Sequence, residues 1–391
     1  MYDALIVGAG PAGSYLASRL ATWGHSVLVF EQHRSIGKAT CCTGIVGKEC
    51  LDAFPIGKRA VVREARSAKF FAPSGECLNL AKETTQAYIV DRMAFDAELA
   101  RSAQMQGAEY LLGSQVRSIT TTKDLARLEV KRNGRIMDFE GKTAVIASGF
   151  RSKLTQGIGL GKNRDFVMGA QAEVEAKEID EVEVYFGSHT APGFFAWLVP
   201  TSQGRALAGL LSRHHTGSYL RSFLNDLANQ GKIASPDVTI SYGGIPLRPL
   251  PRTSRERVIV VGDAAGQVKP TTGGGIYYGL LCAQIAADTL HQALGSNEFS
   301  AKALGGYEKK WRRKLSRELR IGRSARWLFE KLDDRQIEHL FRTARSKRIP
   351  ELLLSSIDFP FDSHGRVILR GARYLGLRGA ISLLWLLVRR R

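Results

Sequence analysis

The first 31 residues limit the fold of this chain more than any other segment, because they order a strand, a glycine-rich turn, a helix and a second strand. Tyr2–Val7 is a short apolar run of the kind that forms a buried strand, and Val27–Phe30 is another. Between them, residues 8–13 read GAGPAG and open a helical stretch that extends to about Ala21. This order predicts a parallel βαβ unit at the start of an α/β fold.

The glycines and one acidic residue of this unit have separate roles in binding a dinucleotide. Gly8 permits the turn, Gly10 lets the backbone approach a pyrophosphate, and Gly13 lets the helix pack on the strand. Ala12 belongs to the same predicted cofactor-binding turn. Glu31 ends the second strand and is placed to hold the hydroxyls of the adenosine ribose. Either NAD or FAD fits this half of a site.

A second glycine-rich stretch, residues 261–281, decides which dinucleotide binds. It reads VGDAAGQVKPTTGGGIYYGLL, and an apolar run expected to form a buried strand leads into it. Asp263 then stands at the carboxyl end of that strand, where it can accept hydrogen bonds from a sugar-alcohol chain. A nicotinamide dinucleotide has no ribityl chain that needs a second acidic residue. FAD is therefore the predicted cofactor.

The three consecutive glycines of this stretch, residues 273–275, suit the ring of a flavin. They let backbone amides approach a planar ring closely, and the helix that follows directs its positive end at negative charge on the reduced ring. A strand-to-helix turn that binds nothing is the alternative. The residues expected beside the pyrimidine half of the ring are Gly274, Gly275 and Ile276.

The other patterns predict a discontinuous domain organisation. Asp91 is a plausible N-cap of an amphipathic helix, and residues 165–245 alternate in strand fashion. We expect a Rossmann-type FAD-binding domain, a second antiparallel-sheet domain for the substrate, and a helical C-terminal extension. The expected ranges are 1–60, 85–160 and 250–300 for the first domain, 61–84 and 161–249 for the second, and 301–391 for the basic helical region.

The positive charge of the chain is concentrated at one end. Residues 301–391 contain 23 Lys and Arg against 9 Asp and Glu, which accounts for +14 of the total +19. Such a concentration suits an anionic membrane surface, a phosphorylated substrate or nucleic acid. The alternative is a solvated helical face that binds no partner. No ribonucleoprotein motif, zinc finger or helix-turn-helix pattern accompanies it, so no nucleic-acid partner is expected.

The last residues combine arginines with an apolar run. Ala380–Val388 is nine residues long, too short for a bilayer span of about 20. An interfacial helix over residues 366–391, with Tyr374 and Trp385 as aromatic anchors, fits better, although the run could also pack on the protein itself. Because the N-terminal apolar run is the first strand and lacks a basic flank, we expect a cytoplasmic protein, peripheral on the cytoplasmic face of a membrane.

The cysteines do not predict a metal site. They have no CxxC pair or His-rich ligand spacing, and an odd number without a secretory signal favours reduced thiols. The five are Cys41, Cys42, Cys50, Cys77 and Cys282.

Three motifs together resemble one known family. GAGPAG, Asp91-Arg92 and the stretch at 261–281 look like the geranylgeranyl reductase family, FAD-dependent prenyl reductases within the group that resembles para-hydroxybenzoate hydroxylase. The stretch PGFFAWLVP at 192–200 resembles the aromatic motif of that family, with Phe195 in place of the usual tyrosine. We expect Phe195, Trp197 and Pro200 to give a rigid apolar surface for an isoprenoid chain, with ordinary core packing as the alternative.

The resemblance also implies roles for four further residues. In the family, the loop after the second strand carries a cysteine and a glycine beside the flavin, and Cys42 and Gly44 fit those places. Cys42 is the only candidate for a catalytic residue, and a buried apolar filler is its alternative. Arg92 is expected to reach the flavin, or else to pair with an acid near its helix start. Val116 is expected to bind the adenine through its backbone.

The implied activity is the reduction of isolated C=C bonds in a geranylgeranyl or other polyprenyl chain on a lipid, diphosphate, quinone or chlorophyll-type substrate. Reduced flavin would deliver hydride to one alkene carbon and a proton would reach the other. The electron donor is NADPH or ferredoxin, and the sequence identifies no proton donor. A monooxygenase or halogenase of the same fold, or a membrane-docked flavin electron-transfer protein, is the alternative.

Overall fold

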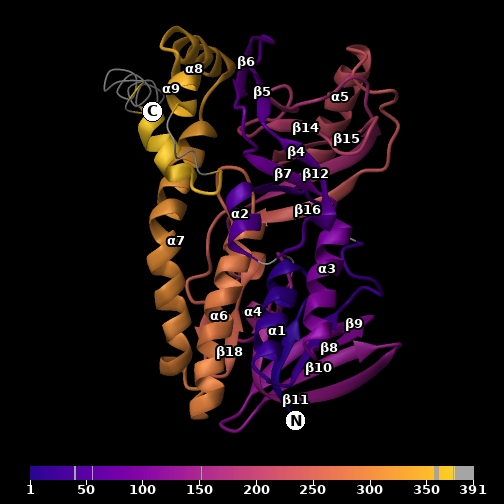
Figure 1. Ribbon diagram of the computed structural model, residues 1–391, viewed down its shortest axis with the longest axis vertical. Coiled ribbons are helices and arrows are strands. Elements are labelled where there is room, and N and C mark those ends of the chain that lie inside the picture. Colours follow the sequence, from indigo (N-terminus) through magenta and orange to yellow (C-terminus); the bar gives the residue numbers. More distant parts are fainter. Residues whose placement is uncertain (39–40, 55, 151, 356–360, 373, 375–391) are drawn as a thin grey trace.

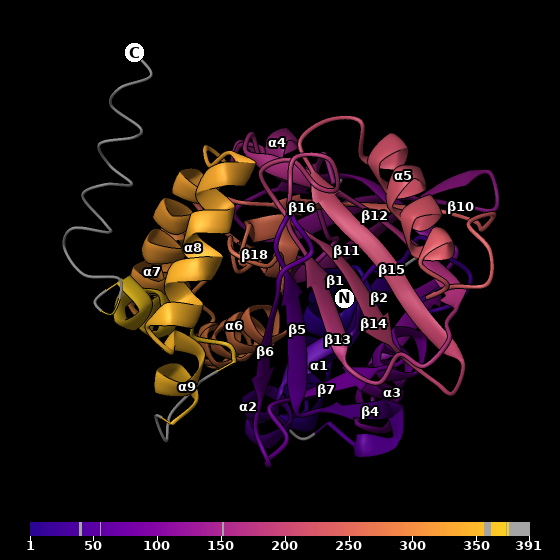
Figure 2. The same cartoon turned by 90° about the horizontal axis from the view of Figure 1, so that it is seen from above.

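Two large sheets and one small sheet form the molecule, with long helices along one side (Figure 1). The computed structural model describes residues 1–38, 41–54, 56–150, 152–355, 361–372 and 374. Figure 2 shows that the C-terminal helices stand on one side of the sheets while α5 (Thr216–Asn229) lies on the opposite side.

The N-terminal sheet has the predicted Rossmann arrangement. β1 pairs in parallel with β2 and β11, β18 joins β11, and β8 joins β2. These strands are β1 (Tyr2–Val7), β2 (Val27–Glu31), β8 (Glu109–Leu112), β11 (Arg135–Ile146) and β18 (Val258–Val260), with β17 (Ser254–Arg255) at one edge. An antiparallel extension adds β9 (Ser114–Thr121) and β10 (Ala126–Arg132). Central strands of such a sheet are buried on both faces, which explains their continuous apolar runs.

The helices on this sheet begin and end where the sequence signals indicate. α1 (Pro11–Thr22) follows the first glycine turn, and α3 (Arg92–Met105) is capped by the Asp91 carboxylate, which accepts the N–H groups of Met93 and Ala94. α6 (Ile276–Ser296) packs against α1.

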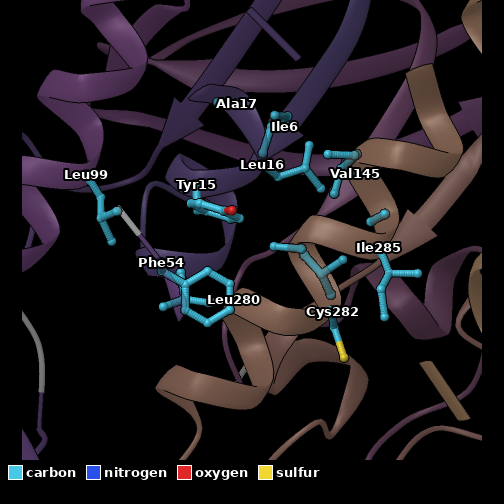
Figure 3. Close-up of a cluster of buried hydrophobic side chains, with 14 of the residues drawn as sticks. Ile6, Tyr15, Leu16, Ala17, Phe54, Leu99, Val145, Leu280, Cys282 and Ile285 are labelled. Carbon is cyan, nitrogen blue, oxygen red and sulfur yellow. The ribbon is translucent and has the colours of Figure 1, made fainter. Parts of the chain in front are cut away.

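Figure 3 shows the core that results from this packing. Ile6 and Val145 on the strands, Leu16 on α1, and Leu280 and Ile285 on α6 all belong to one buried cluster. The core therefore lies directly beneath the two glycine-rich turns, and it fixes their positions.

The second large sheet has seven strands, in the order β16, β12, β15, β14, β13, β5, β6. Their bounds are β5 (Ser67–Phe71), β6 (Cys77–Ala81), β12 (Phe166–Glu175), β13 (Val182–Tyr185), β14 (Ala196–Pro200), β15 (Arg205–Ser212) and β16 (Ser241–Pro246). All neighbouring pairs are antiparallel except β13 with β5. α5 covers one face with Leu220, Phe223 and Leu224, and the other face is left for the site.

A three-stranded sheet joins the two halves. β7 (Ala87–Val90) pairs with β3 (Ile45–Gly47) and with β4 (Val61–Ala65). β4 lies within the range expected for the substrate domain, yet its partner belongs to the range expected for the FAD-binding domain. Short helical segments α2 (Lys48–Ala53), η1 (Lys58–Ala60), α4 (Leu154–Gly157) and η2 (Gly262–Ala265) complete these parts.

The C-terminal region packs into the core of the molecule. α7 (Ala301–Phe329) is followed by α8 (Asp334–Ser346), α9 (Ile349–Leu354) and a helical stretch at 364–372. Tyr307 and Trp311 on α7 are fully buried, while Lys310, Arg313 and Lys314 are exposed. These basic residues of α7 lie on its solvated face, which agrees with the alternative of a solvated helical face, whereas Arg326 of the same helix is buried.

The predicted interfacial helix spans residues 366–391, of which 366–372 and 374 are helical, while 373 and 375–391 lie outside the described residues. Among the residues that the structure describes, no helix is long and apolar enough to cross a bilayer.

Candidate active site

A cavity of about 850 Å³ lies between the Rossmann sheet and the seven-stranded sheet. Both glycine-rich turns, the Cys42 loop and the aromatic segment border it. The predicted site residues that line it are Gly8, Gly10, Ala12, Glu31, Cys42, Arg92, Phe195, Trp197, Asp263, Gly274, Gly275 and Ile276. The fold thus brings together residues more than 260 positions apart in the chain.

Four predicted site residues do not line the cavity: Gly13, Gly44, Val116 and Pro200. A Cβ on Gly13 would overlap the carbonyl oxygen of Gly8, so Gly13 serves the close approach of helix and turn. Gly44 has a φ of +70°, and a Cβ there would overlap the carbonyl oxygen of Val90. Val116 lies on β9 against the Rossmann core. Their contacts with a cofactor or substrate stay predictions.

The first glycine turn is shaped for a pyrophosphate. Gly8 has a φ of +107°, and a Cβ on it would lie 2.5 Å from the carbonyl oxygen of Ala147. No heavy atom of the described residues lies within 4 Å of the Cβ position of Gly10, the N-cap of α1. The positive end of α1 therefore faces open space, as the binding of an anionic group requires.

The carboxylate of Glu31 is fixed at the end of β2. One oxygen accepts the Ala9 N–H at 3.1 Å, and the other accepts the His33 N–H at 2.9 Å and lies 2.8 Å from His33 Nδ1. His33 also lines the cavity, although no sequence motif points to it. These contacts hold the Glu31 carboxylate in a fixed orientation at the position where the adenosine ribose is predicted to bind.

Arg92 pairs with an acid on its own helix. Its guanidinium donates to both carboxylate oxygens of Asp96, with distances of 2.9 and 3.0 Å from Nη2. Burial raises the pKa of Asp96, and the charge of Arg92 opposes that shift. Both side chains border the cavity, so the pair is a structural ion pair that also faces the predicted flavin position.

The second glycine turn is packed so closely that larger residues do not fit. A Cβ on Gly275 would lie 2.6 Å from Asp263 Oδ1, and one on Gly274 would lie 2.7 Å from Lys269 Cε. Asp263 borders the cavity, and burial raises its pKa to about 6 while Arg92 lowers it. α6 begins at Ile276 with its N-terminus on the cavity. An acidic acceptor and a helix N-terminus therefore lie side by side.

The wall on the opposite side is apolar. Phe195 and Trp197 lie with ring centroids 6.0 Å apart, and Val199 continues the wall. A Cβ on Gly209 would lie 2.5 Å from Trp197 Cζ2, so this glycine makes room for the indole. Because side chains alternate along a strand, Val199 shares the face of Trp197, whereas Pro200 points to the other side.

The C-terminal segment supplies cavity residues that the sequence analysis missed. Lys269, in the second glycine turn, forms a buried ion pair with Asp362 at 2.6 Å. Thr271 Oγ1 lies 2.6 Å from Nδ1 of His364, whose pKa burial lowers to about 3. The one signal in the sequence is Lys269 itself, because a charged residue inside a buried glycine turn requires a partner.

Comparisons with known proteins identify the family that shares this arrangement. Residues 3–354 match the family described as lycopene cyclase protein. A digeranylgeranylglycerophospholipid reductase from Methanocella arvoryzae is 31% identical over 336 residues, which cover 81% of this chain and 84% of that protein. This chain belongs to the geranylgeranyl reductase family. A protein of the same name from Methanocaldococcus jannaschii is 29% identical and covers 87% of this chain and 90% of its own length.

Solved structures agree at the level of the fold. A geranylgeranyl bacteriochlorophyll reductase-like protein from Thermoplasma acidophilum superposes with a TM-score of 0.84, at 24% identity and 95% coverage of each chain. A p-nitrophenol 4-monooxygenase from Pseudomonas putida reaches 0.70 at 16% identity, with 96% of this chain and 99% of that chain covered. These likenesses show a shared fold, and they include the fold of the alternative monooxygenase class.

The predicted family, fold class and FAD cofactor are thereby confirmed, and the protein is an oxidoreductase of the geranylgeranyl reductase family. The cavity fits FAD, since its open helix N-terminus at Gly10, its fixed Glu31 and its half-buried Asp263 match the three polar parts of that molecule.

Proposed function

We propose that the protein reduces isolated C=C bonds of a geranylgeranyl chain carried by a membrane lipid. The observation that supports this most directly is one continuous cavity with a polar dinucleotide half and an apolar half. The apolar half is bordered by Phe195, Trp197, Val184 and Leu211, which present rings and branched aliphatic groups. Such a wall suits an isoprenoid chain and offers little to a small polar substrate.

FAD, when bound and reduced, supplies the hydride for this reaction. The α1 N-terminus at Gly10 would hold the pyrophosphate, Glu31 would hold the adenosine ribose, and Asp263 would accept from the ribityl hydroxyls. Phe195 and Trp197 hold the prenyl chain against the ring and exclude water from it. Cys42 lies between the two halves, and Gln171 donates to its carbonyl oxygen at 3.2 Å, so the loop is fixed to the substrate sheet.

Anaerobic incubation of the dithionite-reduced holoenzyme with digeranylgeranylglycerophospholipid tests the activity. Mass spectrometry should show products heavier by whole pairs of hydrogen atoms. Absence of added hydrogen would contradict the proposal. An oxygenated or halogenated product formed only in air would favour the monooxygenase or halogenase, and flavin reoxidation without any change in the lipid would favour electron transfer. Supplying NADPH or reduced ferredoxin in place of dithionite identifies the physiological donor.

Association with an anionic membrane surface is part of the same proposal, because the substrate is a lipid. The support is the charge of residues 301–391, together with the sequence of the last residues. Val367 and Ile368 border the cavity, so a deletion should begin after them. Deletion of residues 375–391 should abolish sedimentation with phosphatidylglycerol vesicles and leave FAD binding intact. Phosphatidylcholine vesicles are the control, and unchanged sedimentation with anionic vesicles would refute membrane binding by the tail.

A further inference from the structure

A cluster of buried ionisable groups borders the cavity where the C-terminal segment meets the second glycine turn. Asp362 is 4% exposed, and its Oδ1 accepts from Lys269 Nζ at 2.6 Å. Glu49, in the first turn of α2, accepts the N–H of Phe361 through Oε1 at 3.1 Å. None of these contacts involves a residue that the sequence assigns to the flavin.

The two remaining carboxylate oxygens of this cluster lie near the same backbone position, Gly47. Asp362 Oδ2 and Glu49 Oε2 are both buried, and neither has a hydrogen-bond partner among the described residues. Both lie against the backbone of Gly47, where a Cβ would overlap Asp362 Oδ2 and lie 2.8 Å from Glu49 Oε2. Two carboxylates so close to one another repel when both are ionised, and a proton shared between their free oxygens relieves that repulsion.

The charges around the pair agree with one extra proton. Lys269 supplies one positive charge for two carboxylates, since it pairs with Asp362 and its charge also lowers the pKa of Glu49. Burial raises the pKa of Glu49, the N–H of Phe361 lowers it, and the nearby Asp362 raises it. The ionisable groups beside the cluster include Tyr278, whose pKa burial raises, and Cys50, Tyr277 and His364. Burial raises the pKa of Cys50 and of Tyr277 and lowers that of His364, so all three stay neutral near pH 7.

The position of Asp362 suits proton transfer to a substrate. It borders the cavity together with the apolar side chains Phe361, Val367 and Ile368 of its own segment. The side chain of its partner Lys269 packs against Gly274, where a Cβ would lie 2.7 Å from Lys269 Cε. Gly274 is expected to lie beside the flavin ring. The other carboxylates on the cavity are already engaged, Glu31 by N–H groups and Asp96 by Arg92, and Asp263 lies at the predicted ribityl position.

We propose that Asp362 is the general acid of alkene reduction, that it shares its proton with Glu49, and that Lys269 positions it. This inference rests on the proposed function. The π bond breaks as reduced flavin gives a hydride to one carbon, and the O–H bond of Asp362 breaks as its proton joins the other carbon. The flavin is left oxidised, the carboxylates of Asp362 and Glu49 are both left ionised beside Lys269, and solvent supplies the proton that restores the pair.

The kinetic test measures how fast the reduced flavin of the holoenzyme is reoxidised in a single anaerobic turnover with the proposed lipid substrate. D362N should slow this step by about 100-fold, the range expected for loss of a general acid, while reoxidation by oxygen stays unchanged. E49Q should also slow this step, because Asp362 loses the partner with which it shares the proton. E318Q is the matched control, since Glu318 holds the same segment through the Gly365 N–H at 2.7 Å.

An infrared measurement tests the shared proton without turnover. Wild-type holoenzyme at neutral pH should show a carboxylic acid C=O band that shifts in D₂O and disappears in both E49Q and D362N but remains in E318Q. A missing band, wild-type rates in D362N, or equal slowing in E318Q and D362N would overturn the inference. A wild-type flavin that the lipid does not reoxidise would instead refute the proposed function, and the infrared band would still decide whether the proton is shared.

Discussion

Asp263 is the residue whose protonation is expected to change most when FAD binds. In the FAD-free protein, burial raises its pKa from 3.8 to about 6, against the lowering effect of Arg92. The neutral form therefore stabilises the FAD-free protein below about pH 4, and this contribution is lost as the pH rises through about 6. Ribityl hydroxyls that donate to the carboxylate favour its ionised form, so FAD binding and protonation of Asp263 oppose one another.

FAD affinity should therefore fall at acid pH, by up to about tenfold for each pH unit below about 6. Asp263→Asn should flatten this pH dependence and weaken binding about tenfold or more at pH 8, because a hydrogen bond to a charged acceptor is lost. Titrations of the apoprotein followed by flavin fluorescence between pH 5 and 8 measure both effects. Asp138→Asn, at an exposed position on β11, is the control. An unchanged slope in Asp263→Asn would show that another group titrates.

Gly275→Ala should weaken FAD binding without unfolding the protein. The new Cβ would lie 2.6 Å from Asp263 Oδ1 and would displace that carboxylate from the cavity. Gly295→Ala lies near the other end of the same helix, where no heavy atom of the described residues lies within 4 Å of the Cβ position. It should leave FAD affinity unchanged and stabilise the helix by up to about 1 kcal/mol. Equal FAD affinity in the two variants would contradict the packing argument.

The sequence predicted the residues of the two glycine turns well because each acts through its own backbone and its neighbours in the chain. Pro200 was predicted on the cavity wall, but its neighbour Val199 lies there instead. Adjacent residues of a strand point to opposite faces, so the prediction needed to know which face of β14 borders the cavity. The carboxylate of Asp362 escaped prediction because its partner, Lys269, lies 93 positions away in the chain. Nothing local marks such a pair.

At the scale of elements, α7 supports the turn that carries Asp263. The Tyr307 hydroxyl donates to the carbonyl oxygen of Val260 at 2.8 Å and accepts from Gln267 Nε2 at 2.8 Å. Gln267 Oε1 in turn accepts the Gly262 N–H at 2.8 Å. This buried chain of hydrogen bonds connects the C-terminal helix to the residues on both sides of Asp263.

Tyr307→Phe should destabilise the protein by about 1–3 kcal/mol, because it leaves the Val260 carbonyl and the Gln267 amide without a buried partner. Thermal unfolding of the apoprotein measures this cost. FAD affinity should fall as well, since the turn loses a support. Tyr219→Phe on α5 is the matched control, because Tyr219 lies far from this turn along the substrate sheet. Equal unfolding temperatures in both variants would contradict the role of α7.

At the scale of the whole molecule, the C-terminal region cannot be removed as an appendage. Trp311 is fully buried, and its Nε1 donates to Thr253 Oγ1 at 2.9 Å. Burial of one large aromatic contributes about 3–5 kcal/mol, compared with a total stability of about 5–15 kcal/mol for a domain.

A chain that ends at residue 300 should therefore fail to give soluble, folded protein, whereas one that ends at residue 374 should fold and bind FAD. Circular dichroism and size-exclusion chromatography of the two truncations decide this. A folded, FAD-binding protein of 300 residues would show that α7 is dispensable.

The sequence by itself determined the Rossmann unit, the FAD cofactor and the family, because these depend on glycines, an acidic residue and short apolar runs in fixed local order. Only the tertiary structure decided which residues close the cavity. Asp362 and His364 come from a segment with no local signal of a site, and packing between distant elements brings them to the second glycine turn. Local chain geometry determines a turn, but the burial of a charge beside its partner depends on the whole fold.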